Sequence, residues 1–217
     1  MEHIKTYHSE ILDTSIGAIT IEGPVTSVEL DQYDFHDDLT AFRVPHKQFD
    51  ALKQIATLPE GRIIIAVHQN TIIGYVIFVY PDPMERWHTD TLKELLVLGA
   101  IEVVPLYRGY QIASRLIMLS MMDSYMENYI TISTEYYWHW DLEGANLDVW
   151  RYRKLMDKIM AKGGLYPTAT DDPEITSHPA NCLMVRIGKN VPEEVIQQFD
   201  NIRFLRRNER TNYGRDY

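Results

Sequence analysis

The residues best suited to chemistry lie between Leu98 and Ile117. An apolar run that ends at Val104 is followed by a turn at Arg108-Gly109 and then by an amphipathic segment. A helix that begins directly after such a turn presents backbone N–H groups without helical partners, together with the positive end of its dipole. These groups bind anions, so the segment predicts a site for a diphosphate, as in a nucleotide-like cofactor.

The turn alone is also compatible with an ordinary strand–turn–helix connection, but its neighbours favour a cofactor. Residues 103–113 read Val-x-Pro-x-Tyr-Arg-Gly-x-x-Ile-Ala, which resembles motif A of the GNAT acetyltransferase superfamily, Arg/Gln-x-x-Gly-x-Gly/Ala. Arg108 stands at the first position of that motif and Ala113 at the last, whereas Gln111 replaces the central Gly. We therefore expect no positive φ at Gln111, and a left-handed Gln111 would weaken the cofactor assignment.

The resemblance implies that acetyl-CoA is the cosubstrate. Val103 and Val104 would pair through their backbone with the pantetheine amides, as an added strand does. The turn would hold the diphosphate through backbone N–H groups, with Arg108 adding positive charge. The expected cofactor-binding residues are Val103, Val104, Arg108, Gly109, Tyr110, Gln111, Ile112, Ala113 and Ser114.

Acetyl transfer to an amine also needs a base, because the amine must be neutral to attack a thioester. The developing oxyanion needs a donor, which in the GNAT superfamily is typically a backbone N–H of the splayed fourth strand. Glu102 on the motif strand and Glu135 on the following strand are the candidate bases. Each carboxylate could instead lie at the surface or in an ion pair, and an ordered water is a third candidate.

Tyr152 is the candidate acid that protonates the leaving thiolate. Residues 146–152 resemble the Asn-x-x-Ala-x-x-x-Tyr pattern of many GNAT proteins, although the spacing is one residue short. A tyrosine on an apolar helix face is more often part of the core, so both interpretations stay open.

Three other features carry weaker signals. The aromatic run at residues 136–140, Tyr-Tyr-Trp-His-Trp, either shapes the acceptor site or ends a packed strand. His139 and His178 have no partner at metal-ligand spacing, so we expect no metal. Cys182 lies in an apolar run and is expected to be a buried, inert thiol rather than a nucleophile.

Composition limits the classes of partner. The chain has 217 residues, 45% of them hydrophobic, which suits one folded domain. A formal charge of −10 argues against a nucleic-acid binder and favours a cationic acceptor. The apolar runs are too short to span a bilayer, and the start of the chain lacks a signal-peptide core. One cysteine fits a reducing compartment, so we expect a cytoplasmic protein.

Periodicity and turn residues predict the elements that position these groups. The motif strand is the fourth strand, and the strand at 62–68 reads as buried on both faces. Further strands are expected at 17–25, 72–80, 129–138 and 181–187, and helices at 46–57, 84–96, 148–162 and 192–199.

This order is that of the GNAT fold, of the α/β (α+β) class. The resemblance implies a central mixed, mostly antiparallel sheet that is splayed at the fourth and fifth strands and flanked by helices. Residues 1–202 would form a single GNAT domain with a C-terminal helix. Residues 203–217 would form a basic tail, either solvated or used for docking, with Arg203, Arg206, Arg207, Arg210 and Arg215.

Segments outside motif A are similar to the acetoin-utilisation acetyltransferases (AcuA type) of spore-forming bacteria. The most specific are the aromatic run and Ser-His-Pro-Ala-Asn-Cys at 177–182, and the similarity spans about residues 3–203. It implies a protein lysine acetyltransferase that modifies and inactivates AMP-forming acetyl-CoA synthetase. The alternatives are a small-amine N-acetyltransferase and an acyl-CoA-sensing regulatory subunit that inhibits its partner by docking. The sequence leaves the oligomeric state and the acceptor lysine open.

Overall fold

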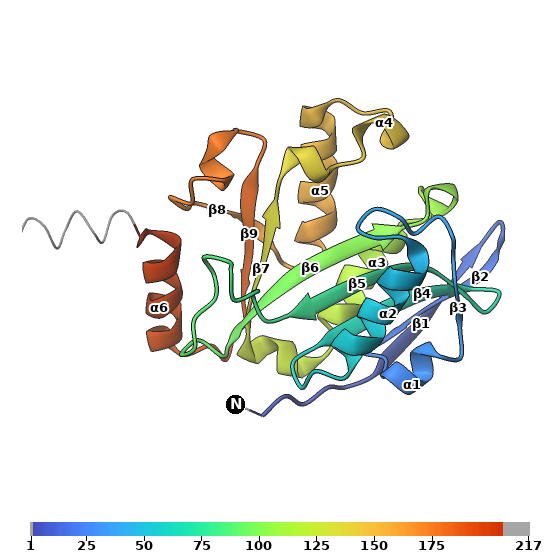
Figure 1. The fold of residues 1–217 in the computed structure, drawn as a ribbon, viewed down its shortest axis with the longest axis horizontal. Helices are drawn as coiled ribbons and strands as arrows, with labels where there is room; N and C mark the ends of the chain where they lie inside the picture. The colour runs from blue at the N-terminus through green and yellow to red at the C-terminus, as the bar shows by residue number, and fades with distance from the viewer. Residues whose placement is uncertain (1, 206–217) are drawn as a thin grey trace, which may run out of the picture. The chain divides into compact units, whose positions relative to one another are not determined.

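The computed structural model describes residues 2–205 (Figure 1). The chain forms two compact units. The first unit is Met1–Tyr80 with Val97–Met126, and the second is Pro81–Leu96 with Glu127–Tyr217. The expectation of one domain over residues 1–202 stays a prediction.

The first unit contains a mixed, mostly antiparallel sheet. Its strands lie in the order β1-β2-β4-β5-β6, with the short β3 parallel to β5 and the other pairs antiparallel. The strands are β1 (His8–Thr14), β2 (Gly17–Gly23), β3 (Asp34–Phe35), β4 (Arg62–His68), β5 (Thr71–Val79) and β6 (Leu95–Val103). Every residue of β4 is buried, which confirms the prediction of a strand covered on both faces.

Helices cover this sheet on both faces. α2 packs against β4 on one face, and α3 packs against β2, β4 and β5 on the other (Figure 1). The helices of the first unit are α1 (Ser27–Leu30), α2 (Pro45–Ala56) and α3 (Ile112–Ser120), with a 3-10 turn η1 at Pro105–Tyr107. The expected hairpin connection between β4 and β5 is present, and Gln69 and Asn70 both have positive φ there.

The second unit contains the antiparallel strands β7, β9 and β8 in that order, with α5 against β8. Its strands are β7 (Ile130–Glu135), β8 (Tyr166–Thr168) and β9 (Cys182–Ile187). Its helices are α4 (Leu142–Ala145), α5 (Val149–Ala161) and α6 (Glu193–Arg203), with 3-10 turns η3 (Tyr137–His139) and η4 (Ile175–Ser177). The 3-10 turn η2 (Ser124–Asn128) begins in the first unit and ends in the second. The predicted helices at 148–162 and 192–199 are therefore confirmed.

The helix predicted at 84–96 is wrong. The segment before β6 consists of turns, because its side chains are held by contacts distant in sequence. The Arg86 guanidinium donates to the carbonyl of Ile202 at 2.6 and 2.9 Å, and the Trp87 ring packs on Phe199. Such tertiary contacts outweigh the small helix propensity of an isolated segment.

The strand predicted at 129–138 is too long. β7 ends at Glu135, and a 3-10 turn follows at Tyr137–His139. The side chain of Asn181 accepts a hydrogen bond from the Tyr137 N–H at 3.0 Å, so this amide is used by a side chain instead of a neighbouring strand.

Two further differences concern the ends of the chain. β1 was not expected, and its exposed Ile11 alternates with partly covered residues, as in an edge strand. Arg203 ends α6, where its guanidinium donates to Asp200 at 2.8 Å, so it does not begin a free tail. The other arginines of the predicted tail lie outside the described residues: Arg206, Arg207, Arg210 and Arg215.

Candidate functional site

The predicted anion site is built by the abrupt passage from β6 to α3. The Val104 N–H donates to Ile73 O at 2.9 Å, which is the last ladder contact of β6. A 3-10 turn follows immediately: the Tyr107 N–H donates to Val104 O at 2.9 Å, and the Arg108 N–H donates to Pro105 O at 3.1 Å. The 3-10 turn η1 thus follows β6 directly, and residues 108–111 connect it to α3.

The turn and the first turn of α3 leave six consecutive N–H groups available. Within residues 2–205, none of the backbone N–H groups from Gly109 to Ser114 donates a hydrogen bond. The first N–H that bonds back into the helix is that of Arg115, which donates to Gln111 O at 3.1 Å. These donors at the positive end of a nine-residue helix fit a diphosphate.

Gln111 differs from the expectation, because it is left-handed with φ 61° and ψ 21°. The chain reverses direction over three residues, and both Gly109 (φ +94°) and Gln111 use left-handed backbone to do so. A non-glycine residue pays about 1–2 kcal/mol for this conformation. The turn therefore keeps the shape that the motif's Gly favours. We expected a left-handed Gln111 to weaken the cofactor assignment, so this geometry is evidence against a cofactor site. The unbonded N–H groups on both sides of Gln111 are evidence for one.

Gly109 and the side chains around it leave room for a ligand. No atom lies within 4 Å of where a Cβ of Gly109 would be, so the backbone is open at that point. Arg108 is exposed, whereas the Ile112 side chain is buried and contributes only its backbone. Ala113 and Ser114 are half-buried in the first turn of α3.

Val103 and Val104 differ in what their backbone offers. The N–H of Val104 is bonded to Ile73 and its carbonyl accepts from Tyr107, so Val104 does not offer the pairing predicted for it. In an antiparallel ladder the backbone groups alternate in direction. Val103, which lies opposite Gly74, therefore turns its N–H and C=O away from β5 and can pair with an extended guest.

A β-bulge interrupts β6 upstream of these residues. Ala100 lies opposite Ile77, but Leu98 lies opposite Phe78, so Gly99 is an extra residue. Gly99 is exposed in an otherwise largely buried strand. Bulges re-aim backbone groups and are frequent beside active sites, which suits a strand expected to supply an oxyanion donor.

Glu102 is a buried carboxylate with two donors. Its Oε1 accepts from the Ala41 N–H at 2.7 Å, and its Oε2 accepts from the Tyr75 hydroxyl at 2.7 Å. Burial, and then the hydrogen bond to Glu102, hold the pKa of Tyr75 well above its usual range, so this hydroxyl stays a donor. Glu102 thus fastens the segment before α2 to β6.

Glu135 occupies the end of β7 in the second unit. Its Oε1 accepts from the Ser133 hydroxyl at 2.8 Å, and its Oε2 accepts from the indole N–H of Trp140 at 3.2 Å. Burial raises the pKa of Glu135, and the bonds to Ser133 and Trp140 only partly oppose this effect. A carboxylate with a raised pKa is a better proton acceptor near neutral pH.

Tyr152 is connected to Glu135 through the same indole. Its ring stacks on Trp140 with centroids 5.2 Å apart and planes at 19°. α5 carries Tyr152, and the Asp148 side chain caps this helix by accepting from the N–H groups of Trp150 and Arg151. The structure therefore groups one candidate base with the candidate acid, which their separation in the sequence did not indicate.

The rest of the aromatic run forms a partly exposed surface. Tyr136 stacks on Trp138 at 4.9 Å, and Trp138 is 48% exposed. Tyr137 packs against His178 at 4.2 Å. The residues are therefore neither a regular strand nor fully packed, which leaves them available to an acceptor.

Three further observations concern the thiol, metal ligands and membrane spans. Cys182 is buried, which confirms that part of the prediction, and burial raises the pKa of its thiol to about 12. Among the described residues there is no cluster of three or more His, Cys, Asp or Glu side chains that could hold a metal. In the same part of the chain, no helix is long and apolar enough to cross a membrane.

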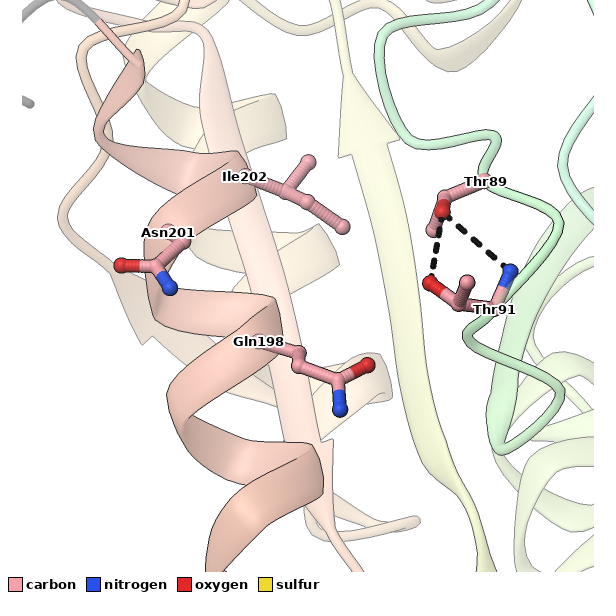
Figure 2. Close-up of a pocket in the computed structure, with 5 residues that line it drawn as sticks. All are labelled: Thr89, Thr91, Gln198, Asn201 and Ile202. Atoms are coloured by element: carbon pink, nitrogen blue, oxygen red, sulfur yellow. Dashed lines mark hydrogen bonds between the residues drawn. The ribbon is translucent and has the colours of Figure 1, made fainter. Parts of the chain in front are cut away.

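A pocket of about 310 Å³ in the second unit is separate from these groups. Its wall consists of Thr89, Thr91, Gln198, Asn201 and Ile202 (Figure 2). The hydroxyls of Thr89 and Thr91 lie 3.0 Å apart and bond to each other. None of these lining side chains is charged and none is a predicted site residue, so the pocket does not suit a diphosphate.

Sequence reasoning missed the partners of both carboxylates. Ser133 could have been found, because residues i and i+2 of a strand share a face. Tyr75, Ala41 and Trp140 could not, because the strand register and the turn after β7 bring them into contact.

Comparison with known proteins gives the family. The model of the acetyltransferase (GNAT) family matches residues 30–133. The acetoin utilization protein AcuA of Bacillus licheniformis is 59% identical over 207 residues, which are 95% of this chain and 99% of that protein. The protein of the same name from Bacillus subtilis has the same identity and coverage. This chain belongs to the GNAT acetyltransferase family.

Solved structures agree with the fold of this GNAT acetyltransferase. The crystal structure of an acetoin utilization protein from Exiguobacterium sibiricum is 55% identical, has a TM-score of 0.91, and covers 94% of this chain and 97% of that chain. The GNAT domain of PAT from S. lividans, at 10% identity, has a TM-score of 0.52 and covers 82% of this chain and 96% of that chain, which shows the fold alone. The family model spans the turn and Glu102, whereas Glu135, Tyr152 and the β1–β2 hairpin lie outside it.

Proposed function

We propose that this acetyltransferase moves the acetyl group of acetyl-CoA to a lysine of AMP-forming acetyl-CoA synthetase and thereby inactivates it. The relatives that match almost the whole chain are named acetoin utilization proteins, which supports a role in acetoin utilisation. We further propose a cytoplasmic location, which the single, buried thiol suits.

The observation that carries the choice of cosubstrate is the row of free N–H groups from Gly109 to Ser114. These groups would hold the diphosphate, Arg108 would add positive charge, and Val103 would pair with the extended arm. Acetyl-CoA, when bound, supplies an activated acyl group as a thioester. The protein itself has to orient the acetyl group and accept one proton from the acceptor ammonium.

Glu135 is our choice of base. Its raised pKa allows it to take a proton from an ammonium more readily than an ordinary carboxylate does. The Ser133 hydroxyl can turn from donor to acceptor once Glu135 carries the proton, so the protonated state keeps a partner. For Glu102 the structure favours a role in holding the segment at Ala41.

A protein acceptor fits the surface better than a small amine. The net charge of −10 attracts a cationic acceptor. The partly exposed Trp138 and Trp150 add the large aromatic rings that are enriched in protein interfaces.

Mass spectrometry of acceptors after reaction with acetyl-CoA tests the proposal. We expect one modified lysine on the synthetase, loss of synthetase activity in step with modification, and no turnover of free amines. Turnover of small amines without synthetase labelling would instead support the small-amine enzyme.

A variant with Glu102→Gln and Glu135→Gln separates chemistry from docking. If synthetase inhibition persists when acetyl transfer is lost, inhibition by binding is the function and the proposal is wrong. If inhibition disappears together with transfer, the modification is what inactivates the synthetase.

A further inference from the structure

The β1–β2 hairpin is bonded to the turn that holds the free N–H groups. The Ser15 hydroxyl lies 3.2 Å from the Tyr110 hydroxyl. His68 lies between the hairpin and the same turn, with Nδ1 at 3.0 Å from the Tyr107 hydroxyl and Nε2 at 3.0 Å from the carbonyl of Ile16. Two tyrosines of the turn are thus linked to the tip of one hairpin.

The hydrogen-bond partners fix the direction of the His68 link. The carbonyl of Ile16 can only accept, so His68 Nε2 carries a proton and donates to it. In the neutral ring Nδ1 is then the acceptor, and the Tyr107 hydroxyl donates to it. His68 is 8% exposed, so water competes little for these two bonds.

The hairpin is shaped to admit the histidine. Gly17 has φ +117°, and a Cβ added there would lie 3.2 Å from His68 Nε2. A side chain at Gly17 would therefore press on the ring that joins the hairpin to Tyr107. A third link runs from Arg115 in the first turn of α3 to Glu10 on β1, at 3.4 Å.

The turn needs such external support, because it has little of its own. Its N–H groups from Gly109 to Ser114 make no bonds within the described chain, and Gln111 is held in left-handed backbone. A segment of this kind loses conformational entropy when it becomes ordered around a ligand, and this loss weakens binding. If the segment is already ordered before the ligand binds, the loss is smaller and the affinity is higher.

We propose that the β1–β2 hairpin is a positioning element for coenzyme binding, acting through Ser15, His68 and Tyr107. It holds the N–H donors of the turn in place before the diphosphate arrives. This inference rests on the proposed use of acetyl-CoA at this turn. β1 and β2 lie outside the part of the chain that the family model matches.

The test is the double variant Ser15→Ala/Tyr107→Phe. It removes the two hydroxyls and keeps the aromatic ring at position 107 and the backbone of the hairpin. We expect the Kd for CoA, measured by calorimetry, and the KM for acetyl-CoA to rise on the order of tenfold, as the loss of two modest hydrogen bonds predicts. The kcat and the KM for the acceptor should stay near the parent values. In the free protein, exchange of the Arg115 amide hydrogen, which is bonded to Gln111 O, should become faster.

Tyr33→Phe is the matched control, because it removes a tyrosine hydroxyl bonded to Glu22 on β2 and touches no residue of the turn. It should leave CoA binding and the exchange of the Arg115 amide hydrogen unchanged. A fall in kcat with an unchanged Kd for CoA, or equal effects of control and double variant, would overturn the positioning role. If the parent protein itself neither binds CoA nor transfers acetyl, the proposed function fails, which is a separate result.

Discussion

Glu102 in the first unit and Glu135 in the second are two buried carboxylates with the same kind of neighbours. Each accepts from one N–H group, which can only donate, and from one hydroxyl, which can also accept. They differ in what the N–H belongs to. Glu102 binds a backbone amide and so holds a segment of chain, whereas Glu135 binds the indole of Trp140, which stacks on Tyr152.

The comparison indicates that burial alone does not make a carboxylate catalytic. Glu135 has a raised pKa, because the loss of water outweighs its two side-chain donors. We infer that it is suited to exchange a proton, and that Glu102 is suited to stay bonded and maintain the fold. Variants of the two regions should therefore change different quantities.

The largest effect is expected for Glu135→Gln, which keeps the shape of the side chain and removes the base. We expect kcat/KM to fall by about 10²–10⁴-fold, the usual contribution of a general base. The rise of activity with pH that reports ionisation of Glu135 should disappear from the profile. Glu143→Gln, on the exposed helix α4, is the matched control and should keep full activity.

The same variant should not lose stability at neutral pH. A carboxyl whose pKa is raised by folding stabilises the native state only while it is protonated, and that contribution is lost as the pH rises through the folded pKa. Glutamine has no charge to bury, so the free energy of unfolding of Glu135→Gln at pH 7 should equal or exceed that of the parent. A variant as active as the parent would show that Glu135 is not the base.

Tyr75→Phe should have the next largest effect, and on stability rather than on rate. It leaves Glu102 Oε2 buried without its donor, which costs about 1–3 kcal/mol. In a chain of this size each kcal/mol lowers Tm by about 2–4 °C, which thermal unfolding can measure. The pH profile of the remaining activity should not move. A large loss of kcat in a folded Tyr75→Phe protein would instead place Glu102 in the chemistry.

The smallest effect is expected for Ser133→Ala, and it sharpens the comparison. The Ser133 hydroxyl lowers the pKa of Glu135, so its removal should raise that pKa further. The ascending limb of the pH–rate profile should therefore shift to higher pH, with only a small loss of rate on the plateau. An unchanged limb would mean that a group other than Glu135 titrates in catalysis.

Much of the site was predictable because its signals are local. The Arg108-Gly109 turn, the buried β4 and the helix α5 depend on residues close together in the chain, and all three are present. The prediction failed where distant contacts decide. Arg86 and Trp87 are held by α6, so the segment at 84–96 is not helical, and Asn181 ends β7 early.

By itself, the sequence determined the position of the turn before α3, the buried strand β4 and the helices α2, α5 and α6, and it named the candidate acid and bases. Periodicity, turn residues and motif spacing are properties of neighbouring residues, so they can be read without the fold. Only the tertiary structure decided that Gln111 is left-handed, that Val104 is already bonded to Ile73, and that Trp140 joins Glu135 to Tyr152. These features depend on strand register and on the path of the chain between elements. Residues far apart in the sequence come into contact only after the chain has folded.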